Sequence, residues 1–199
     1  DKKYFPKKGS SSLISLGYSK LLSGKIKREY SKTSFTPDHP GDFMFKRAYS
    51  ASAGFRKYFQ TGRKVSMSLG GNVLFTYTKD SLTSPQNYFL LGGIEASTSR
   101  SIPLAGFRDN EIEVDRMAGI RYGTDIEFRK DLHLCFIANF AVAHEPVKEK
   151  ELSLYGGYGL GLGYMSIIGP LKIGLMQGFS DNEMYFRSLK GYISIGFNF

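Results

Sequence analysis

The feature that most constrains this fold is a strict alternation of side-chain types at the end of the chain. The last nine residues read GYISIGFNF, with large apolar side chains at Ile193, Ile195, Phe197 and Phe199 and mostly small or polar ones between them. A period of two is that of a β-strand, whose successive side chains point to opposite faces. Such a strand is either half-buried in a sandwich or faces lipid on one side and a wet lumen on the other.

Other segments alternate in the same way, which makes the strand the dominant predicted element. The predicted strands cover residues 10–22, 47–59, 64–78, 118–130, 133–144, 154–166, 170–180 and 188–199. Each is near or above the roughly 9–11 residues that a tilted strand needs to cross a bilayer. Strands of globular proteins average only about 5–6 residues. The length of the segments therefore favours the membrane interpretation.

The composition suits strands and barrel bends better than helices. Aromatic residues make up 15% of the chain, and 23 residues are Gly. No apolar run of about 18 residues is present, so no transmembrane helix is predicted; barrel strands never form such runs. The formal charge of +9 suits nucleic acid, anionic lipid or lipopolysaccharide. Because Lys and Arg are spread over turns and loops, we expect no nucleic-acid partner.

The connections between the predicted strands alternate in length. QTGRK, KDLH and IIGP form tight turns, whereas residues 23–46, 79–117, 145–153 and 181–187 form long connections. Short periplasmic turns and long extracellular loops are typical of an outer-membrane barrel. An even number of strands then places both termini in the periplasm. With no repeat, heptad or linker, residues 1–199 are predicted to form one domain. Asp1 is not a start methionine and no signal peptide is present, so we expect a processed protein or an excised domain.

Several motifs, in order, resemble one family. DKKYFPKKGSSSLISL resembles a barrel-strand entry in the outer-membrane assembly factor and translocase superfamily, also called bacterial surface antigens. NYFLLGG followed by IPLAGFRDNEI is similar to the family's sixth extracellular loop. GYGLGLGYMSIIGPLKIGL is similar to its penultimate hairpin, and GYISIGFNF to its C-terminal signal. The resemblance covers nearly the whole chain. It is closest to the barrel attached to patatin-like phospholipases of Gram-negative bacteria.

This resemblance implies an antiparallel transmembrane β-barrel that anchors, and inserts or translocates, polypeptide without bond chemistry. It also implies outer-membrane lipid, lipopolysaccharide, the outer-membrane assembly machinery and a second copy of the chain as partners. The lumenal loop motif comprises Pro103, Gly106, Phe107 and Arg108. The C-terminal signal comprises Tyr192, Phe197 and Phe199.

The sequence departs from the family pattern in several places. Ala105 stands where the loop motif usually has Arg, and Arg108 follows Gly106 by two positions. The missing Arg favours the patatin-like subgroup. Ser194 replaces a usual Gly, and residues 1–199 include no periplasmic module ahead of the first predicted strand. The family barrel usually has sixteen strands, whereas this chain resembles its second half, to be completed by strands of the parent chain or by a second copy.

Alternate glycines share the inward face of the predicted strand 154–166. They either ease barrel curvature or form a smooth trough into which the loop 79–117 folds, with Phe107 near Gly159 or Gly161. The trough comprises Gly157, Gly159, Gly161 and Gly163.

Charged residues share the inward face of the predicted strand 118–130. Because unpaired charges are costly in a lumen of low dielectric constant, they are expected to pair with each other, with water or with Arg108. These lumenal charges are Arg121, Asp125, Glu127 and Arg129.

No motif for catalysis or for metal binding is found. The Gly-x-Ser-x-Gly elbow of a patatin-type hydrolase does not occur. His39, His133 and His144 show no metal-ligand spacing to each other or to Cys135, and Cys135 is expected to be a small inward filler. We therefore expect no enzyme activity, metal or cofactor here; a lipase domain would lie outside this chain.

Two rival interpretations remain. One is a plain eight-stranded structural or adhesion barrel that binds through its long loops and fills its lumen with side chains. The other is a soluble lipid-binding barrel, whose apolar face would lie inside. The contents of the lumen and the direction of the apolar face separate these alternatives from the membrane anchor.

Overall fold

The computed structural model describes residues 6–20, 47–78, 88–96, 98–146, 152–166, 169–181 and 189–195. All regular secondary structure in these ranges is β-strand. No helix long and apolar enough to cross a membrane occurs among these residues. The predicted all-β class is confirmed.

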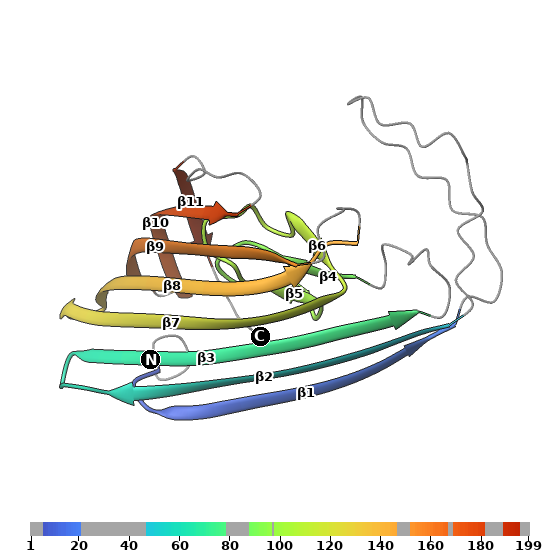
Figure 1. The fold of residues 1–199 in the computed structure, drawn as a ribbon. Coiled ribbons are helices and arrows are strands. Elements are labelled where there is room, and N and C mark those ends of the chain that lie inside the picture. Colours follow the sequence, from blue (N-terminus) through green and yellow to red (C-terminus); the bar gives the residue numbers. More distant parts are fainter. Residues whose placement is uncertain are drawn as a thin grey trace.

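Eight long strands form one antiparallel sheet, shown in Figure 1. In sheet order they are β1 (Gly9–Ser19), β2 (Ala48–Gln60), β3 (Val65–Thr78), β7 (Arg116–Arg129), β8 (Leu132–His144), β9 (Ser153–Ser166), β10 (Gly169–Ser180) and β11 (Lys190–Ile195). Each overlaps one of the predicted strands. The long strands pair in chain order, which is the topology of a β-meander.

Two of the short connections show why the chain reverses where the sequence predicts. After β2, the amides of Thr61 and Gly62 donate to the carbonyl oxygen of Val65, at 3.1 and 3.3 Å. After β7, Asp131 has a φ of 63°, in the left-handed region that Asp tolerates better than most residues. These local features close tight turns between long antiparallel strands.

The large sheet is curved, but it does not close. β1 and β11 each have a single neighbouring strand among the described residues, and they lie at opposite edges of the curved sheet (Figure 1). Most of β1 is exposed on both faces. The predicted antiparallel sheet is thus confirmed, whereas the described residues do not by themselves form a closed barrel.

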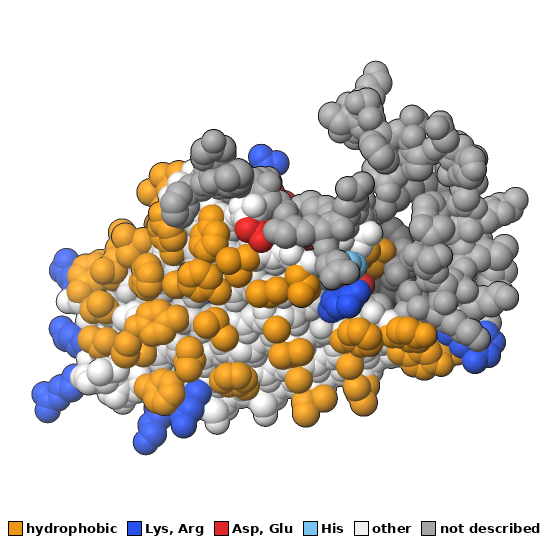
Figure 2. Space-filling model, viewed as in Figure 1, with side chains coloured by type: hydrophobic (Ala, Val, Ile, Leu, Met, Phe, Trp, Pro, Cys, Tyr) orange, Lys and Arg blue, Asp and Glu red, His pale blue; other side chains and the backbone are white. Residues whose placement is uncertain are grey.

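The two faces of the sheet follow the predicted alternation. Large apolar side chains are exposed on the convex face, among them Leu16, Phe75, Ile120, Phe140 and Leu160. Figure 2 shows hydrophobic side chains over this face, with most of the visible Lys and Arg toward the ends of the strands. An outward apolar face is the opposite of what a soluble lipid-binding barrel requires.

The concave face is covered by the chain between β3 and β7. Three short strands form there, β4 (Phe89–Leu91), β5 (Ser101–Ile102) and β6 (Ile112–Val114). β4 is central, parallel to β5 and antiparallel to β6. In Figure 1 this small sheet lies within the curve of the large one. The sequence did not predict these strands because two or three residues carry too little periodicity.

Candidate functional site: the loop inside the sheet

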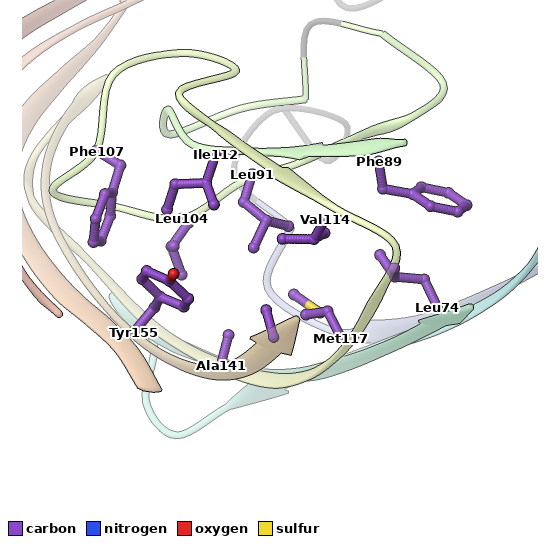
Figure 3. Packing of buried hydrophobic residues seen from close by; sticks show 11 residues of the cluster. Leu74, Phe89, Leu91, Leu104, Phe107, Ile112, Val114, Met117, Ala141 and Tyr155 are labelled. Carbon is purple, nitrogen blue, oxygen red and sulfur yellow. The ribbon is translucent and has the colours of Figure 1, made fainter. Parts of the chain in front are cut away.

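The inner loop (residues 88–115) is held against the concave face by one hydrophobic cluster. Phe107 and Val114 of the loop are fully buried, at 0% exposure. Figure 3 shows the loop and sheet side chains meeting in this cluster. The sheet contributes Leu74, Met117, Ala141, Ala143 and Tyr155, and the loop contributes Phe89, Leu91, Leu104, Phe107, Ile112 and Val114. The loop therefore packs on the inside of the sheet as a core element.

The tip of the inner loop contacts the sheet backbone at two places, and each close approach requires a glycine. Gly106 has a φ of 89°, and a β-carbon added to it would lie 2.2 Å from the backbone nitrogen of Gly178 in β10. A β-carbon on Gly157 in β9 would lie 1.8 Å from the carbonyl oxygen of Ala105. These approaches are possible only without side chains at Gly106 and Gly157. The tip thus packs backbone against backbone on β9 and β10.

Two side chains of the sheet fix the position of the tip. The Asn139 Oδ1 in β8 accepts a hydrogen bond of 2.9 Å from the Ala105 amide. The Tyr155 ring meets the Phe107 ring edge-on, with 5.8 Å between the centroids, which is a favourable aromatic geometry. The Tyr155 hydroxyl donates to the Glu145 carboxylate. The tip is therefore held by both a polar and an aromatic contact.

Lys190 connects the tip to the edge strand β11. Its Nζ donates to the carbonyl oxygen of Gly106 at 3.1 Å and to the Glu111 carboxylate at 3.2 Å. The same ammonium lies 5.8 Å from the centroid of the Phe107 ring, within the range of a cation–π contact. Glu111 also accepts from the Arg108 amide at 2.5 Å. Through Lys190, the inner loop is attached to β11, an edge strand of the sheet as described.

Glu95 makes a second connection between the inner loop and the edge. Its carboxylate accepts from Lys172 Nζ of β10 at 2.6 Å and from the Ser194 hydroxyl of β11 at 3.3 Å. Burial alone would raise the pKa of Glu95, but Lys172, Ser194 and the charge of Arg121 together hold that pKa below its ordinary value. Glu95 is therefore a carboxylate at neutral pH, and its charge is bound to the sheet.

Arg121 holds the inner loop from β7. Its Nη2 donates to the carbonyl oxygen of Ile94 at 2.7 Å, while its Nη1 is buried without a hydrogen-bond partner. Glu95 attracts this guanidinium and Arg56 repels it. These groups, with Tyr192, border a cavity of about 590 Å³ on the concave side. Arg121 thus supports the loop and contributes positive charge to the lumen.

The glycines predicted to form the trough all lie buried on the concave face. They are Gly157, Gly159, Gly161 and Gly163. Of the positions predicted to receive Phe107, Gly159 faces Met176 and Gly161 faces the Tyr192 hydroxyl.

The predicted position of Phe107 near Gly159 or Gly161 is therefore wrong. The Phe107 ring packs against Tyr155, and a β-carbon on Gly178 would lie 2.9 Å from it. The reason is steric: the side chains of Met176 and Tyr192 already occupy the space beside Gly159 and Gly161. The tip therefore settles nearer the ends of β9 and β10 that join the long connections.

The other predicted residues of the loop motif take different positions. Pro103 is half-buried and borders the concave cavity, and Gly106 and Phe107 form the buried tip. Arg108 is exposed, and its amide rather than its side chain makes the contact with Glu111. The motif thus acts through backbone shape and one aromatic ring.

The predicted lumenal charges use partners other than Arg108. Asp125 accepts from His133 Nδ1 at 2.8 Å and from the Cys135 thiol at 3.3 Å. Glu127 pairs with Lys7 at 2.8 Å, and Arg129 is exposed at the end of β7. Of the three expected alternatives, pairing with Arg108 is the one that the structure does not support, because that side chain is exposed while Asp125 and Glu127 bind other groups.

The predicted C-terminal signal is described only in part. Tyr192 lies on the concave side, with its hydroxyl toward Gly161, as the alternation of β11 requires. Phe197 and Phe199 lie outside the described residues.

Sequence reasoning missed the residues that hold the inner loop. Asn139 is the amide side chain among the inward positions of β8. This inward polar group is the feature of the sequence that could have indicated a contact with the inner loop. Lys190 and Glu95 gave no signal, because their partners are far away in the sequence. Gly178 is not part of a row of alternate glycines such as that of β9, so the sequence did not mark it as a contact of the loop.

Comparison with known proteins agrees with this architecture. No curated protein matches the chain significantly. A family model described as the OMP85 superfamily matches residues 1–199. At the family level, this superfamily acts in insertion and translocation at the bacterial outer membrane. The chain therefore belongs to the OMP85 superfamily.

Proposed function

We propose that this chain forms part of the wall of an outer-membrane β-barrel, anchors an attached polypeptide, and inserts or translocates polypeptide where its sheet edges meet other strands. The observation that carries this proposal is the open antiparallel sheet wrapped around its own inner loop. The mechanism involves no bond chemistry: the loop braces the wall, and the edges provide the site that can open.

The physics of the bilayer supports completion of the sheet by further strands. An open sheet edge leaves unpaired amides and carbonyls in hydrocarbon, and lipid-exposed edges of this kind do not occur in membranes. Closure of eight strands on themselves would leave a lumen only wide enough for side chains. Here a three-stranded loop lies on the concave face, which favours a larger barrel.

The inner loop also argues against the plain structural barrel. In that rival the sheet fills its own lumen, and the long connections bind partners outside. Here the loop supplies Phe107, Leu104 and Val114 to the inner core. A loop packed in this way is a brace rather than a free binding surface.

We further propose that the chain resembles the barrel of patatin-like phospholipases, with any hydrolase domain outside these residues. Ala105 in place of the usual loop Arg supports this subgroup. The short turns after β2 and β7 support a periplasmic position for that end of the sheet and hence for both termini. A second copy, or strands of the parent chain, would supply the missing part of the wall.

The proposal is tested by cross-linking the two edges in outer membranes. Ile14 in β1 and Ile193 in β11 are 77% and 75% exposed. Each is replaced by Cys in a Cys135→Ser background, and a short bis-maleimide is added. Ile173 and Ile193 are direct register partners, so the pair Ile173→Cys and Ile193→Cys is the positive control.

Each outcome decides between the modes of closure. A cross-link between two differently tagged chains, one with Ile14→Cys and one with Ile193→Cys, supports completion by a second copy. If the control pair cross-links and no cross-link forms between the edges, the result supports completion of the wall by other strands. A cross-link within a single chain of monomeric mass in detergent contradicts the proposal and favours the plain barrel.

A further inference from the structure

A groove crosses the convex, lipid-facing side of the sheet from β1 to β9. Its volume is about 640 Å³, and its lining is almost entirely apolar. Small residues, including Ala53 and Ala118, lie beside the larger Phe55, Ile120 and Phe140. The groove is separate from the inner loop, which packs on the other face of the sheet.

The strand register explains why this wall is hollow. One row across the sheet reads Ile14, Ala53, Val73, Ala118, Val142 and Leu154. In the adjacent row, Phe55 lies beside Gly71, and a β-carbon on Gly71 would lie 2.7 Å from the Phe55 ring. On the far side of the same row, Phe140 packs on Phe179 with 5.6 Å between ring centroids. The large rings thus have partners of their own, and the small residues leave a depression.

A cation lies on the same face, beside the part of the groove that β7 lines. Arg116 is two residues before Ala118 on β7, about 7 Å along the strand. Its side chain is 56% exposed. Its carboxylate neighbour, Asp115, lies at 3.7 Å and also accepts from His144 Nδ1 at 2.6 Å. A guanidinium has five N–H donors, so this long ion pair leaves Arg116 able to bind a phosphate.

We propose that the groove binds an acyl chain of the lipid A part of lipopolysaccharide, with a lipid phosphate on Arg116. This inference rests on the orientation given under the proposed function. In that orientation Arg116 lies at the extracellular end of β7, where the outer leaflet carries phosphorylated lipid. The acyl chain then runs from that end along the groove toward the middle of β1–β3.

The two parts of the site contribute different kinds of selectivity. Lipid tails are as apolar as the groove, so removal of apolar surface from water does not drive acyl-chain binding here. A chain that fits the groove instead gains dispersion contacts, which are lost where the groove is empty. The phosphate gains charge-assisted hydrogen bonds, for which the planar fork of Arg is well suited. The groove therefore selects a chain that fits, and Arg116 selects phosphate.

Native mass spectrometry of the refolded chain in detergent tests this site with three probes: lipid A, dephosphorylated lipid A and phosphatidylglycerol. We expect the chain to retain lipid A in preference to both other lipids. Ala118→Phe fills the groove and should reduce retention of lipid A with or without phosphate. Arg116→Gln should remove the preference for lipid A over dephosphorylated lipid A. We expect that preference to be roughly tenfold, as for one charge-assisted contact.

Ala138→Phe is the matched control, because Ala138 faces outward on β8 between Tyr122 and Tyr158, away from the groove. It should leave lipid retention unchanged, and heat-modified gel mobility confirms that each variant is folded. Equal retention by the Ala118→Phe and Ala138→Phe variants would overturn the groove as the site. A preference for phosphatidylglycerol over lipid A would overturn the assignment to lipid A. Neither result bears on the edge cross-links, so the two proposals fail independently.

Discussion

The carbonyl oxygen of Ala105 lies so close to Gly157 that a β-carbon on Gly157 would come within 1.8 Å of it. The Ala105 amide is at the same time bonded to Asn139 at 2.9 Å. The loop tip therefore cannot move away from Gly157 without breaking a buried hydrogen bond. One glycine in β9 and one amide in β8 together define where the inner loop sits.

Gly157→Ala should therefore displace the loop tip. The added methyl group meets backbone rather than a flexible side chain, and overpacking of this kind costs about 1–3 kcal/mol. We expect a lower unfolding temperature in detergent and faster tryptic cleavage after Arg108. Gly159→Ala is the matched control, since its β-carbon would lie 3.4 Å from its nearest neighbours. Equal behaviour of the two variants would show that the tip does not rest on Gly157.

The β-strands could be predicted because their signal is local. A period of two over ten or more residues fixes which face each side chain takes, so the outward Phe136 and Leu162 and the inward Asp125 follow from the sequence. The site could be predicted only in part. The glycines of β9 were recognised, but only the inner loop itself determines that Gly157 receives the tip.

The contacts of the inner loop could not be predicted because they are long-range. Lys190 and Gly106 are separated by 84 residues, and neither shows a pattern that points to the other. Closure of the sheet is likewise not encoded locally, since the edges β1 and β11 alternate like the inner strands. The alternation of side chains predicts which face of a strand each residue takes, but it does not predict which strand lies beside it.

Lys190→Met should loosen the attachment of the tip to β11. The change removes one partner from the Gly106 carbonyl oxygen and from Glu111, and hydrogen bonds to charged groups contribute about 1.5–3 kcal/mol. We expect a smaller effect for Lys190→Arg, which keeps the charge. A double-mutant cycle with Glu111→Gln measures the coupling by thermal unfolding in detergent. Additive effects of the two changes would contradict a direct contact.

Stability should fall in acid because of Glu95. Its pKa is lower in the folded chain than its ordinary value of 4.5, so folding favours the carboxylate. The stabilisation is complete above that ordinary value and is lost as the pH falls through the lower, folded pKa. Thermal unfolding between about pH 7 and pH 3 should show this loss, and Glu95→Gln should show less of it. An unchanged acid slope in Glu95→Gln would assign the loss to other groups.

Charge on the convex face should be far more damaging than charge on the concave face. Leu175 lies outward near the middle of β10 and is 53% exposed, so Leu175→Arg places a guanidinium in hydrocarbon. An Arg at the bilayer midplane costs a transmembrane barrel about 2–4 kcal/mol. Ser68 points inward and borders the polar concave cavity, where Ser68→Arg meets water and polar groups. We expect Leu175→Arg to lower the folded yield in liposomes strongly and Ser68→Arg to lower it little. The reverse order of folded yields would mean that the convex face does not meet lipid.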